Sequence, residues 1–455
     1  MKVLLVNPGS DNAFTKVGFI VPPLGLAYVA ASLRDAGHEV AIHDFNVEAE
    51  PPDYGAYDLV GISGDTFRHN RALGIAAEAK KAGALTVIGG PHVTFLDTET
   101  LADQNVDFIV RGEGEATAAE LADTIELGSG FHGISGLSFK GDGQVVRNPA
   151  RTPPQDLDAL PFPARDLLKM DRYRSLELAK RKVTSIVSSR GCPSGCSFCA
   201  SHRYAGRKWR ARSVESLLEE VRLVVGQYNF GGVAFVDDNF TLDPRRVIGL
   251  SQALINEKID IKWWCFSRSD TIVRNPEMVE WMAKSGCRYV FMGVESPHKG
   301  LLDRYSKKAT ADQAEQAVKL LKKHRIETLA AYILGAPDET REMIEETIRF
   351  AVKLDTGGVQ YTLLTPFPGT PLLEEMKGRL LSDNWDDFDC THPVVRSDYL
   401  SPKELNELMF KGYKSFYLRP KRFLISVLST LRGRGVKIRE VKRLIENFRK
   451  ETSGA

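Results

Sequence analysis

Three cysteines crowded into eight residues give the sequence its strongest chemical signal. Cys192, Cys196 and Cys199 stand at Cys-x3-Cys-x2-Cys spacing, and the glycine and proline residues beside them allow a tight curl of the backbone. Thiolates spaced in this way can hold three irons of a cubane cluster, and three ligands for four irons leave one iron open to an exogenous ligand. We therefore expect a [4Fe-4S] cluster of the reactive kind, with these three cysteines as its metal ligands.

Spacing alone leaves two other chemistries open for this loop. His202 follows Cys199 at a two-residue gap and could complete a Cys3His zinc site. A disulfide is less favoured, because the loop holds an odd number of cysteines and the chain as a whole is poor in them. The remaining cysteines, Cys265, Cys287 and Cys390, are scattered, and we expect each to be a small buried apolar side chain rather than a ligand.

The cysteine loop directly follows the first of six strand–helix units. Strands are predicted at Val183–Ser188, Val233–Asp237, Ile261–Phe266, Tyr289–Gly293, Thr328–Leu334 and Val359–Leu364. Six units are two fewer than in the usual eight-stranded barrel, where active sites gather at the carboxyl ends of the strands. We predict a partial (β/α)6 barrel over residues 181–375, with an open side for a large substrate or a neighbouring domain.

An earlier alternation of strands and helices over residues 1–130 predicts an α/β domain with a doubly wound parallel sheet. Its strands are predicted at Val3–Val6, Val40–His43, Leu59–Ser63, Thr86–Ile88 and Phe108–Val110. Each ends in glycine or another turn-forming residue, and ligands of such sheets bind beyond the carboxyl ends of the strands. Glycines in any single loop need no ligand, but several such loops on one edge predict a binding domain. No Gly-x-Gly-x-x-Gly follows the first strand, so a dinucleotide is disfavoured.

Two less regular segments complete the chain. Residues 131–180 are predicted to be a linker with a hairpin turn at Gly141-Asp142-Gly143. Residues 376–455 are predicted to be a mostly helical, basic extension, in which Ser401 caps a helix and Pro402 is its first residue. From Ser401 onward there are 14 Lys and Arg against five Asp and Glu.

The apolar residues that follow Arg419 are bracketed by cations, which would suit peripheral contact with an anionic membrane. Packing of this segment on the barrel, with its cations in water, is favoured because the apolar run is short.

The composition bounds the rest. With 455 residues, 43% of them hydrophobic, the chain is long enough for two or three folded domains. A net charge of +2 gives no case for nucleic-acid binding. The N-terminal apolar run is too short for a signal peptide or a membrane span, so a cytoplasmic location is expected.

The cysteine loop, with an aromatic residue just before its third cysteine, resembles that of the radical S-adenosylmethionine (SAM) enzymes, and the resemblance extends through the barrel to about residue 375. It implies that the open iron chelates the amino and carboxylate groups of SAM. One-electron reduction then yields methionine and a 5′-deoxyadenosyl radical, which abstracts hydrogen from the substrate. The protein binds and orients the reactants, while the cofactor carries the hard chemistry.

The same resemblance assigns SAM contacts to the strand ends of the barrel. The second strand ends in two carboxylates placed for the methionine amino group, and the third in an arginine for the methionine carboxylate. The fourth ends in a carboxylate and a hydroxyl near the ribose, and the fifth in a glycine near the adenine. With the aromatic residue of the cysteine loop, the implied SAM contacts are Phe198, Asp237, Asp238, Arg268, Glu295, Ser296 and Gly335.

The N-terminal domain and the barrel together look like the cobalamin-binding branch of the radical SAM superfamily, similar to the anaerobic magnesium-protoporphyrin ester cyclase and to cobalamin-dependent methylases of carbon or phosphorus. Pro22–Ala27, Gly89–Thr94, Arg111–Glu115 and Thr365–Pro371 carry this likeness. The Asp-x-His-x-x-Gly motif of the methionine-synthase type is absent, so no histidine is predicted on cobalt. The implied cobalamin contacts are Ser63, Asp65, Thr66, Gly89, Gly90, His92, Thr94, Gly112 and Glu113.

The resemblance favours methyl transfer to an unactivated carbon, with methylcobalamin as the methyl donor at the domain interface. Radical cyclisation or another oxidative rearrangement without methyl transfer is one alternative, and a non-catalytic iron–sulfur electron carrier is another. The expected partners are a small-molecule or lipid-like substrate and an external one-electron donor such as flavodoxin or ferredoxin.

Overall fold

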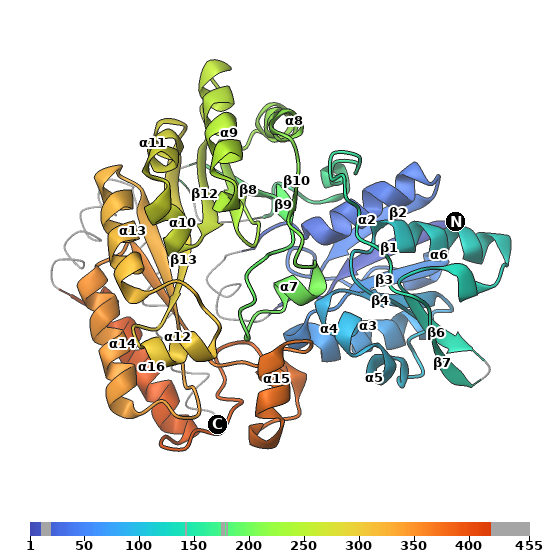
Figure 1. Ribbon diagram of the computed structural model, residues 1–455. Helices are drawn as coiled ribbons and strands as arrows, with labels where there is room; N and C mark the ends of the chain where they lie inside the picture. The colour runs from blue at the N-terminus through green and yellow to red at the C-terminus, as the bar shows by residue number, and fades with distance from the viewer. Residues whose placement is uncertain (11–19, 142, 174–177, 179–180, 420–455) are drawn as a thin grey trace.

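The computed structural model describes residues 1–10, 20–141, 143–173, 178 and 181–419, which form two α/β units side by side (Figure 1). The N-terminal unit is a seven-stranded sheet in the order β2-β1-β3-β4-β5-β6-β7. Its five parallel strands confirm the prediction and are β1 (Lys2–Asn7), β2 (Glu39–Asp44), β3 (Leu59–Ser63), β4 (Leu85–Gly89) and β5 (Phe108–Val110).

Helices cover both faces of this sheet, as in a doubly wound fold. Val3 and Leu5 of β1 pack with α2 and α6, whereas Leu4 and Val6 pack with α3. The strand order reverses between β1 and β3, which is where such sheets bind their ligands. The helices are α2 (Leu24–Asp35), α3 (His69–Lys81), α4 (Pro91–Phe95), α5 (Asp97–Leu101) and α6 (Glu115–Leu127).

A β-hairpin extends the N-terminal sheet. Strand β6 (Leu137–Gly141) pairs antiparallel with β5 and with β7 (Gln144–Arg147), which confirms the predicted hairpin. The sheet thus continues into residues 131–180. Farther along, Arg165 donates to the Ser185 carbonyl at 2.7 Å and pairs with Glu220 at 2.6 Å, with both charged side chains fully buried. This ion pair fixes the connecting segment to the barrel.

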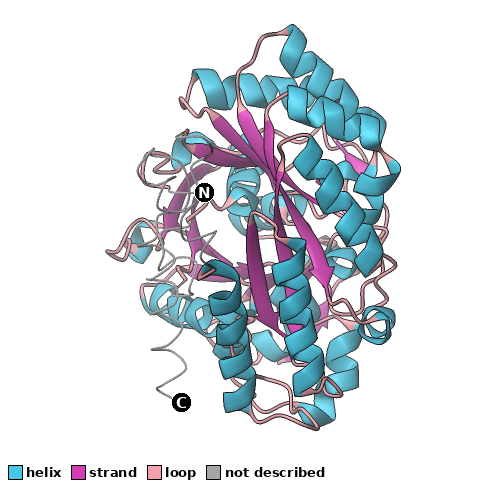
Figure 2. Cartoon of the chain, turned by 90° about the vertical axis from the view of Figure 1, so that its left-hand side faces the viewer, coloured by secondary structure: helices cyan, strands magenta, loops and turns pink. Residues whose placement is uncertain are grey.

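The second unit is an open parallel barrel in the order β15-β14-β13-β12-β11-β8, and Figure 2 shows its strands as a curved layer with helices along the outside. All six predicted strands are present, as β8 (Val183–Ile186), β11 (Gly232–Phe235), β12 (Lys262–Ser267), β13 (Cys287–Glu295), β14 (Glu327–Leu334) and β15 (Gly358–Leu363). Between β8 and β11 lie two short strands and a short helix, β9 (Ser189–Arg190), α7 (Ser201–Tyr204) and β10 (Arg210–Ala211). The remaining helices are α8 (Val214–Gly226), α9 (Pro244–Asn256), α10 (Ser269–Arg274), α11 (Pro276–Lys284), α12 (Lys299–Arg304), α13 (Ala311–Lys323), α14 (Arg341–Leu354), α15 (Pro371–Met376) and α16 (Pro402–Tyr417).

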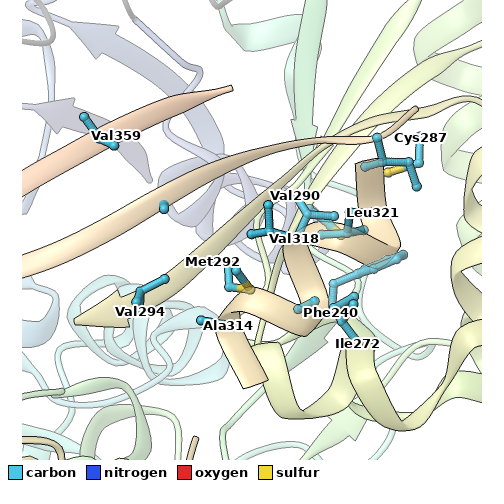
Figure 3. Close-up of a cluster of buried hydrophobic side chains, with 14 of the residues drawn as sticks. Phe240, Ile272, Cys287, Val290, Met292, Val294, Ala314, Val318, Leu321 and Val359 are labelled. Carbon is cyan, nitrogen blue, oxygen red and sulfur yellow. The ribbon is translucent and has the colours of Figure 1, made fainter. Parts of the chain in front are cut away.

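Alternate residues of the barrel strands form the largest core. Val290 and Met292 of β13 pack against Val318 and Leu321 of α13 (Figure 3). Because successive strand residues point to opposite faces, the residues between them point into the barrel. The helices are therefore held by the outer face of the sheet, and the inner face is left for a ligand.

The helix α16 covers the β15 edge of the barrel. Its N-terminus is capped by Ser401, whose hydroxyl accepts from the Glu404 N–H, with Pro402 as its first residue, so the predicted cap is confirmed. The Tyr413 hydroxyl accepts from the N–H of Tyr361 at 3.1 Å and donates to its carbonyl at 3.0 Å. Tyr417 makes the same pair of bonds to Val359 of β15, at 3.1 and 3.2 Å.

The two tyrosines fit the edge strand because of simple geometry. Four residues of helix rise about 6.0 Å, close to the roughly 6.6 Å spanned by two residues of strand. Gly412 allows the close approach, since a Cβ there would lie 2.9 Å from the Tyr361 ring. The hydroxyls thus satisfy backbone groups that a seventh strand would otherwise pair.

Among the described residues, no helix is both long enough and apolar enough to cross a membrane. The apolar run after Arg419, for which the sequence allows either packing on the barrel or membrane contact, falls within residues 420–455, outside the described part of the chain.

We expect Tyr413→Phe to lower the free energy of unfolding by about 1–3 kcal/mol, because the buried N–H and carbonyl of Tyr361 lose their partner. Chemical denaturation followed by fluorescence measures the change. The matched control is Tyr399→Phe, at a side chain that is 63% exposed, which should alter stability by less than about 0.5 kcal/mol. Equal effects of the two substitutions would contradict this account of the edge.

Candidate active site

The cysteine loop leaves the barrel after β8 and is fixed at its base by backbone pairing between β9 and β10. The Cys192 N–H donates to the Gly206 carbonyl at 3.1 Å. Gly191, just before it, has a φ of +85°, and a Cβ there would lie 2.5 Å from the Lys208 carbonyl oxygen. Only glycine fits at this turn, so the tight curl expected from the sequence is present.

None of the three thiols is in a disulfide. Burial raises the pKa of the Cys196 and Cys199 thiols, so metal binding at these positions would displace protons. Within the described ranges, no three His, Cys, Asp or Glu side chains surround a single point in the manner of a mononuclear metal site. The thiolates of a cubane cluster instead bind separate irons.

Asp237, at the end of β11, holds the base of the cysteine loop. Its carboxylate accepts from the Ser188 N–H at 2.6 Å and from the Ser189 hydroxyl at 2.7 Å, and it lies 3.6 Å from the Arg246 guanidinium. The side chain is buried by these contacts. Asp237 is therefore engaged in orienting the loop rather than presented to a ligand.

The neighbouring Asp238 is exposed to solvent instead. Its side chain is exposed, and surrounding protein raises the pKa of the carboxyl by desolvation, while a hydrogen bond from Ser201 acts in the opposite sense. Its charge also acts on the Cys199 thiol. Of the two adjacent carboxylates, Asp238 is thus the one available beside the cysteine loop.

Charged side chains at the ends of β12 and β13 and in the loop after α12 act on the Cys196 thiol. After burial, the largest influences on the pKa of its thiol are the charges of Lys307 and Arg268, which lower it, and that of Glu295, which raises it. Lys307 Nζ lies 2.7 Å from Glu295 Oε1, and both side chains are nearly buried. Arg268 donates through Nε to Asp270 at 3.0 Å. Its two terminal nitrogens have no hydrogen-bond partner among the described residues. Those nitrogens are free to bind a carboxylate bidentately.

Sequence reasoning missed Lys307. It follows α12 and directly precedes Lys308, and nothing local distinguishes the lysine that turns inward from its neighbour. The signal lies in the fold, because Ser306 ends the helix with a φ of +52° and the Lys307 N–H returns to the Leu302 carbonyl at 2.8 Å. That turn directs Lys307 towards β13.

The end of β13 is irregular where it meets this ion pair. The pairing register with β14 shifts between Gly293 and Glu295, and Glu295 has a φ of +64°. A Cβ on Gly293 would lie 2.3 Å from Glu295 Oε1 and 2.9 Å from Lys307 Nζ. The bulge therefore folds the glutamate back over the glycine, a strained geometry of the sort found at functional sites.

The remaining predicted SAM contacts lie on the neighbouring loops. The Phe198 ring meets Tyr305 edge-to-face, with 5.5 Å between the ring centroids, and packs against the apolar cluster that includes Ala336. Gly335, at the end of β14, donates its N–H to Glu339 at 2.7 Å. The Ser296 hydroxyl is buried and accepts from a backbone N–H two residues on, at 3.1 Å.

The predicted cobalamin residues lie together on the carboxyl edge of the N-terminal sheet. Asp65 accepts from Arg68 Nε at 2.8 Å, and Arg68 also reaches Asn7 at the end of β1, at 2.9 Å. The Thr94 hydroxyl donates to the Gly90 carbonyl at 2.7 Å and accepts from the Gly112 N–H at 2.9 Å. These bonds join the end of β1 to the loop after β3, and the loop after β4 to the loop after β5, while Asn7 also donates to Asp44 at the end of β2, at 2.8 Å.

Small residues at this edge leave the backbone open to close approach by a ligand. Ser63 and Gly89 end their strands half-buried, and Gly90 packs so closely that a Cβ would lie 2.4 Å from the Gly64 carbonyl oxygen. At Gly112, by contrast, a Cβ would meet no atom within 4 Å. The edge can therefore admit a flat ring close to the backbone.

Two of the predicted cobalamin residues are engaged elsewhere. Glu113 is buried in ion pairs with Arg190, at 2.7 Å, and Arg210. His92 is buried against His69 and under Trp385, which comes from the segment after the barrel, with ring centroids 4.0 and 5.0 Å away. Its Nδ1 lies 3.3 Å from the Thr66 hydroxyl, and burial lowers the pKa of its ring to about 3, so the ring is neutral.

The inner face of the barrel carries partly exposed aromatic rings. Trp264, Phe266 and Phe291 alternate with the helix-facing residues of β12 and β13 and are half-buried. The ring centroids of Trp264 and Phe266 lie 5.2 Å apart, and those of Phe266 and Phe291 lie 4.9 Å apart. Tyr289, on the same strand as Phe291, is 40% exposed. This face offers stacking and apolar contact to a ligand.

Comparison with known proteins decides the family. The family model of the radical SAM superfamily matches residues 186–351, and that of the B12 binding domain matches residues 12–122. An uncharacterised methyltransferase of Pyrococcus horikoshii is 38% identical over 92% of this chain and 93% of that protein. The chain belongs to the radical SAM superfamily.

Two further comparisons place this radical SAM enzyme within the superfamily. The anaerobic magnesium-protoporphyrin IX monomethyl ester cyclase of Rubrivivax gelatinosus is 28% identical over 93% of this chain and 78% of that protein. The structure of TsrM, a radical SAM methyltransferase of Kitasatospora setae, with cobalamin and a [4Fe-4S] cluster bound has a TM-score of 0.73 at 18% identity, covering 99% of both chains. The latter is a likeness of fold, and it includes both domains.

The cofactors of this radical SAM enzyme are a [4Fe-4S] cluster, SAM and cobalamin. The residues present fit all three. Free thiols sit on a tightly turned loop, unpaired guanidinium nitrogens and an exposed carboxylate lie beside it, and the N-terminal sheet ends in an edge of small residues.

Glu339 should make the stability of this radical SAM enzyme depend on pH. It is fully buried, and desolvation raises the pKa of its carboxyl from 4.5 to about 7, against hydrogen bonds from the Gly335 and Ala336 N–H groups that lower it. Because the folded-state pKa lies above the unfolded one, the group's contribution is fully present below 4.5 and is lost as the pH rises through about 7.

As the pH rises from below 4.5 to above about 7, we therefore expect the unfolding free energy of wild type to fall by about 3 kcal/mol relative to that of Glu339→Gln. Chemical denaturation of the anaerobic protein at a series of pH values gives the difference between the two curves. Parallel curves would contradict the assignment.

Proposed function

We propose that this radical SAM enzyme methylates an unactivated carbon of an apolar small molecule, with cobalamin taking part in the methyl transfer. One observation carries the proposal. The cysteine loop is held both by Asp237 at the end of a barrel strand and by the edge of the N-terminal sheet, where the Tyr204 hydroxyl donates to the Gly112 carbonyl at 2.9 Å. The similarity to a methyltransferase of Pyrococcus horikoshii supports the choice of reaction.

When bound, the three cofactors supply an electron, a carbon radical and a transferable methyl group. The chain's own residues bind and orient them. Arg268 would hold the methionine carboxylate through its unpaired terminal nitrogens, and Asp238 would accept from the methionine amino group. Asp237 keeps the cysteine loop in place, and Lys307 neutralises Glu295 within the buried site.

Apolar packing beside the loop excludes water. Phe198 packs against an apolar cluster that includes buried Leu301, Ile333 and Met376, so the cluster joins the cysteine loop to β14 and α15. Gly335, held by Glu339, would lie near the adenine. A site closed in this way protects a reactive carbon radical from side reactions.

The substrate is expected to be an apolar small molecule. The inner face of the barrel presents the rings of Trp264, Phe266, Tyr289 and Phe291 to whatever occupies it. The name of the cyclase relative gives a magnesium-protoporphyrin ester as its substrate. Such a large, flat molecule could stack on a face of aromatic rings. An external one-electron donor of the flavodoxin or ferredoxin type completes the proposal.

Radical cyclisation without methyl transfer is the second candidate, and the similarity to the cyclase favours it. Product analysis separates the two. With SAM, dithionite and substrate, methylation predicts S-adenosylhomocysteine alongside 5′-deoxyadenosine, and methyl-deuterated SAM should give a deuterated product. Formation of 5′-deoxyadenosine alone, with no label in the product, would establish cyclisation or rearrangement in place of methylation.

We expect Cys196→Ala to abolish both iron–sulfur loading and reductive SAM cleavage, because the cubane loses one of three ligands. Iron and sulfide analysis and chromatography of 5′-deoxyadenosine measure the two effects. Cys390→Ala is the control, since that thiol lies outside the loop and is bonded to Thr365. Normal cleavage by Cys196→Ala, or equal loss in the control, would overturn the assignment of the loop.

A further inference from the structure

A buried group of four charges joins the N-terminal domain to the cysteine loop. Arg190 pairs with Glu113 at 2.7 Å and with Glu115 at 2.6 Å, and Arg210 pairs with Glu113 through both of its terminal nitrogens. Both carboxylates belong to the N-terminal domain and both arginines to the barrel. At least 86% of each of these side chains is shielded from solvent.

Glu113 lies between two arginines of the barrel whose charges would otherwise repel each other. Arg190 and Arg210 stand directly opposite each other in the β9–β10 pair. Like charges in that position repel, and burial makes the repulsion stronger. Glu113 reaches in from the other domain and accepts from both guanidinium groups, so one carboxylate compensates both.

The strand pair that Glu113 stabilises carries a cluster ligand. Arg190 is followed by Gly191 and Cys192, and the Cys192 N–H is held by Gly206, in the turn that leads to Arg210. Between these points, the Tyr204 hydroxyl donates to the Gly112 carbonyl at 2.9 Å. The arm of the loop that bears Cys192 is therefore closed on the residues next to Glu113.

We propose that Glu113 is a positioning residue for the iron–sulfur cluster: the N-terminal domain supplies the carboxylate that holds Arg190 and Arg210 together and thereby fixes the arm carrying Cys192. Docking of the cobalamin-binding domain thus completes the cluster-binding loop. The inference rests on the proposed function in taking Cys192 as a cluster ligand. It assigns Glu113 to the cluster loop and not to cobalamin.

The first arm of the test uses the full chain without metal. In wild type, trypsin should cut slowly between residues 203 and 212, where Arg203, Arg207 and Arg210 lie. Glu113→Gln, which keeps the shape and removes the charge, should speed cleavage there by about tenfold or more, as loss of a buried charged hydrogen bond implies. Equal cleavage of the two proteins would overturn the proposal whether or not a cluster binds.

The second arm uses the reconstituted protein. Glu113→Gln should release iron to a chelator about tenfold faster or more, and its cluster should have a more positive midpoint potential, because one nearby negative charge is gone. Glu115→Gln breaks only one of the ion pairs and should show the same changes to a smaller degree, which keeps the test open if Glu113→Gln fails to fold.

The control removes an ion pair between the N-terminal domain and the connecting segment. Asp166→Asn breaks the solvent-exposed pair with Arg34, away from the cysteine loop, and should leave trypsin cleavage, iron release and potential as in wild type. Changes in Asp166→Asn equal to those in Glu113→Gln would show a general loosening of the domains and would overturn the specific role of Glu113. If wild type itself binds no cluster, the proposed function fails, and the trypsin arm still decides the contact.

Discussion

Two buried carboxylates, one from each domain, hold the loop that carries the cysteines. Asp237 of the barrel fixes Ser188 and Ser189, and Glu113 of the N-terminal domain fixes Arg190. The chain then turns at a glycine into Cys192. A loop of three thiols has little apolar surface with which to fix itself, so charge pairing at its base sets its geometry. The rest of the site is arranged around that fixed point.

The two sheets leave different surfaces open to ligands. In the N-terminal domain both faces are covered by helices, which leaves only the strand ends for ligands. In the barrel only the outer face is covered, so the inner face is available as well as the strand ends. The free edge at β15 needs another solution, and the hydroxyls of Tyr413 and Tyr417 provide it. The backbone of β15 is thus bonded by side chains of α16 where a further strand is absent.

Much of this could be predicted from the sequence, because the signals are local. Hydrophobic periodicity predicts the parallel strands of both sheets, and Ser401 followed by Pro402 predicts the start of α16. The spacing of Cys192, Cys196 and Cys199 predicts the cysteine loop. The likeness to radical SAM enzymes and the cobalamin-binding branch was also confirmed.

Contacts between distant segments could not be predicted in this way. Asp237 and Asp238 are adjacent and chemically alike, yet one orients the loop and the other is exposed to solvent. Lys307 turns inward because the chain reverses after α12, with Ser306 at a φ of +52°. The role of Glu113 depends on arginines about eighty and a hundred residues away.

The central claim is that three cysteines hold a cubane whose fourth iron binds SAM. Mössbauer spectroscopy of protein loaded with iron-57, with and without SAM, tests it most directly. We predict a [4Fe-4S] spectrum in which one iron site of the four changes when SAM is added. Four iron sites that are indifferent to SAM, or a preparation that holds zinc without sulfide, would contradict the account.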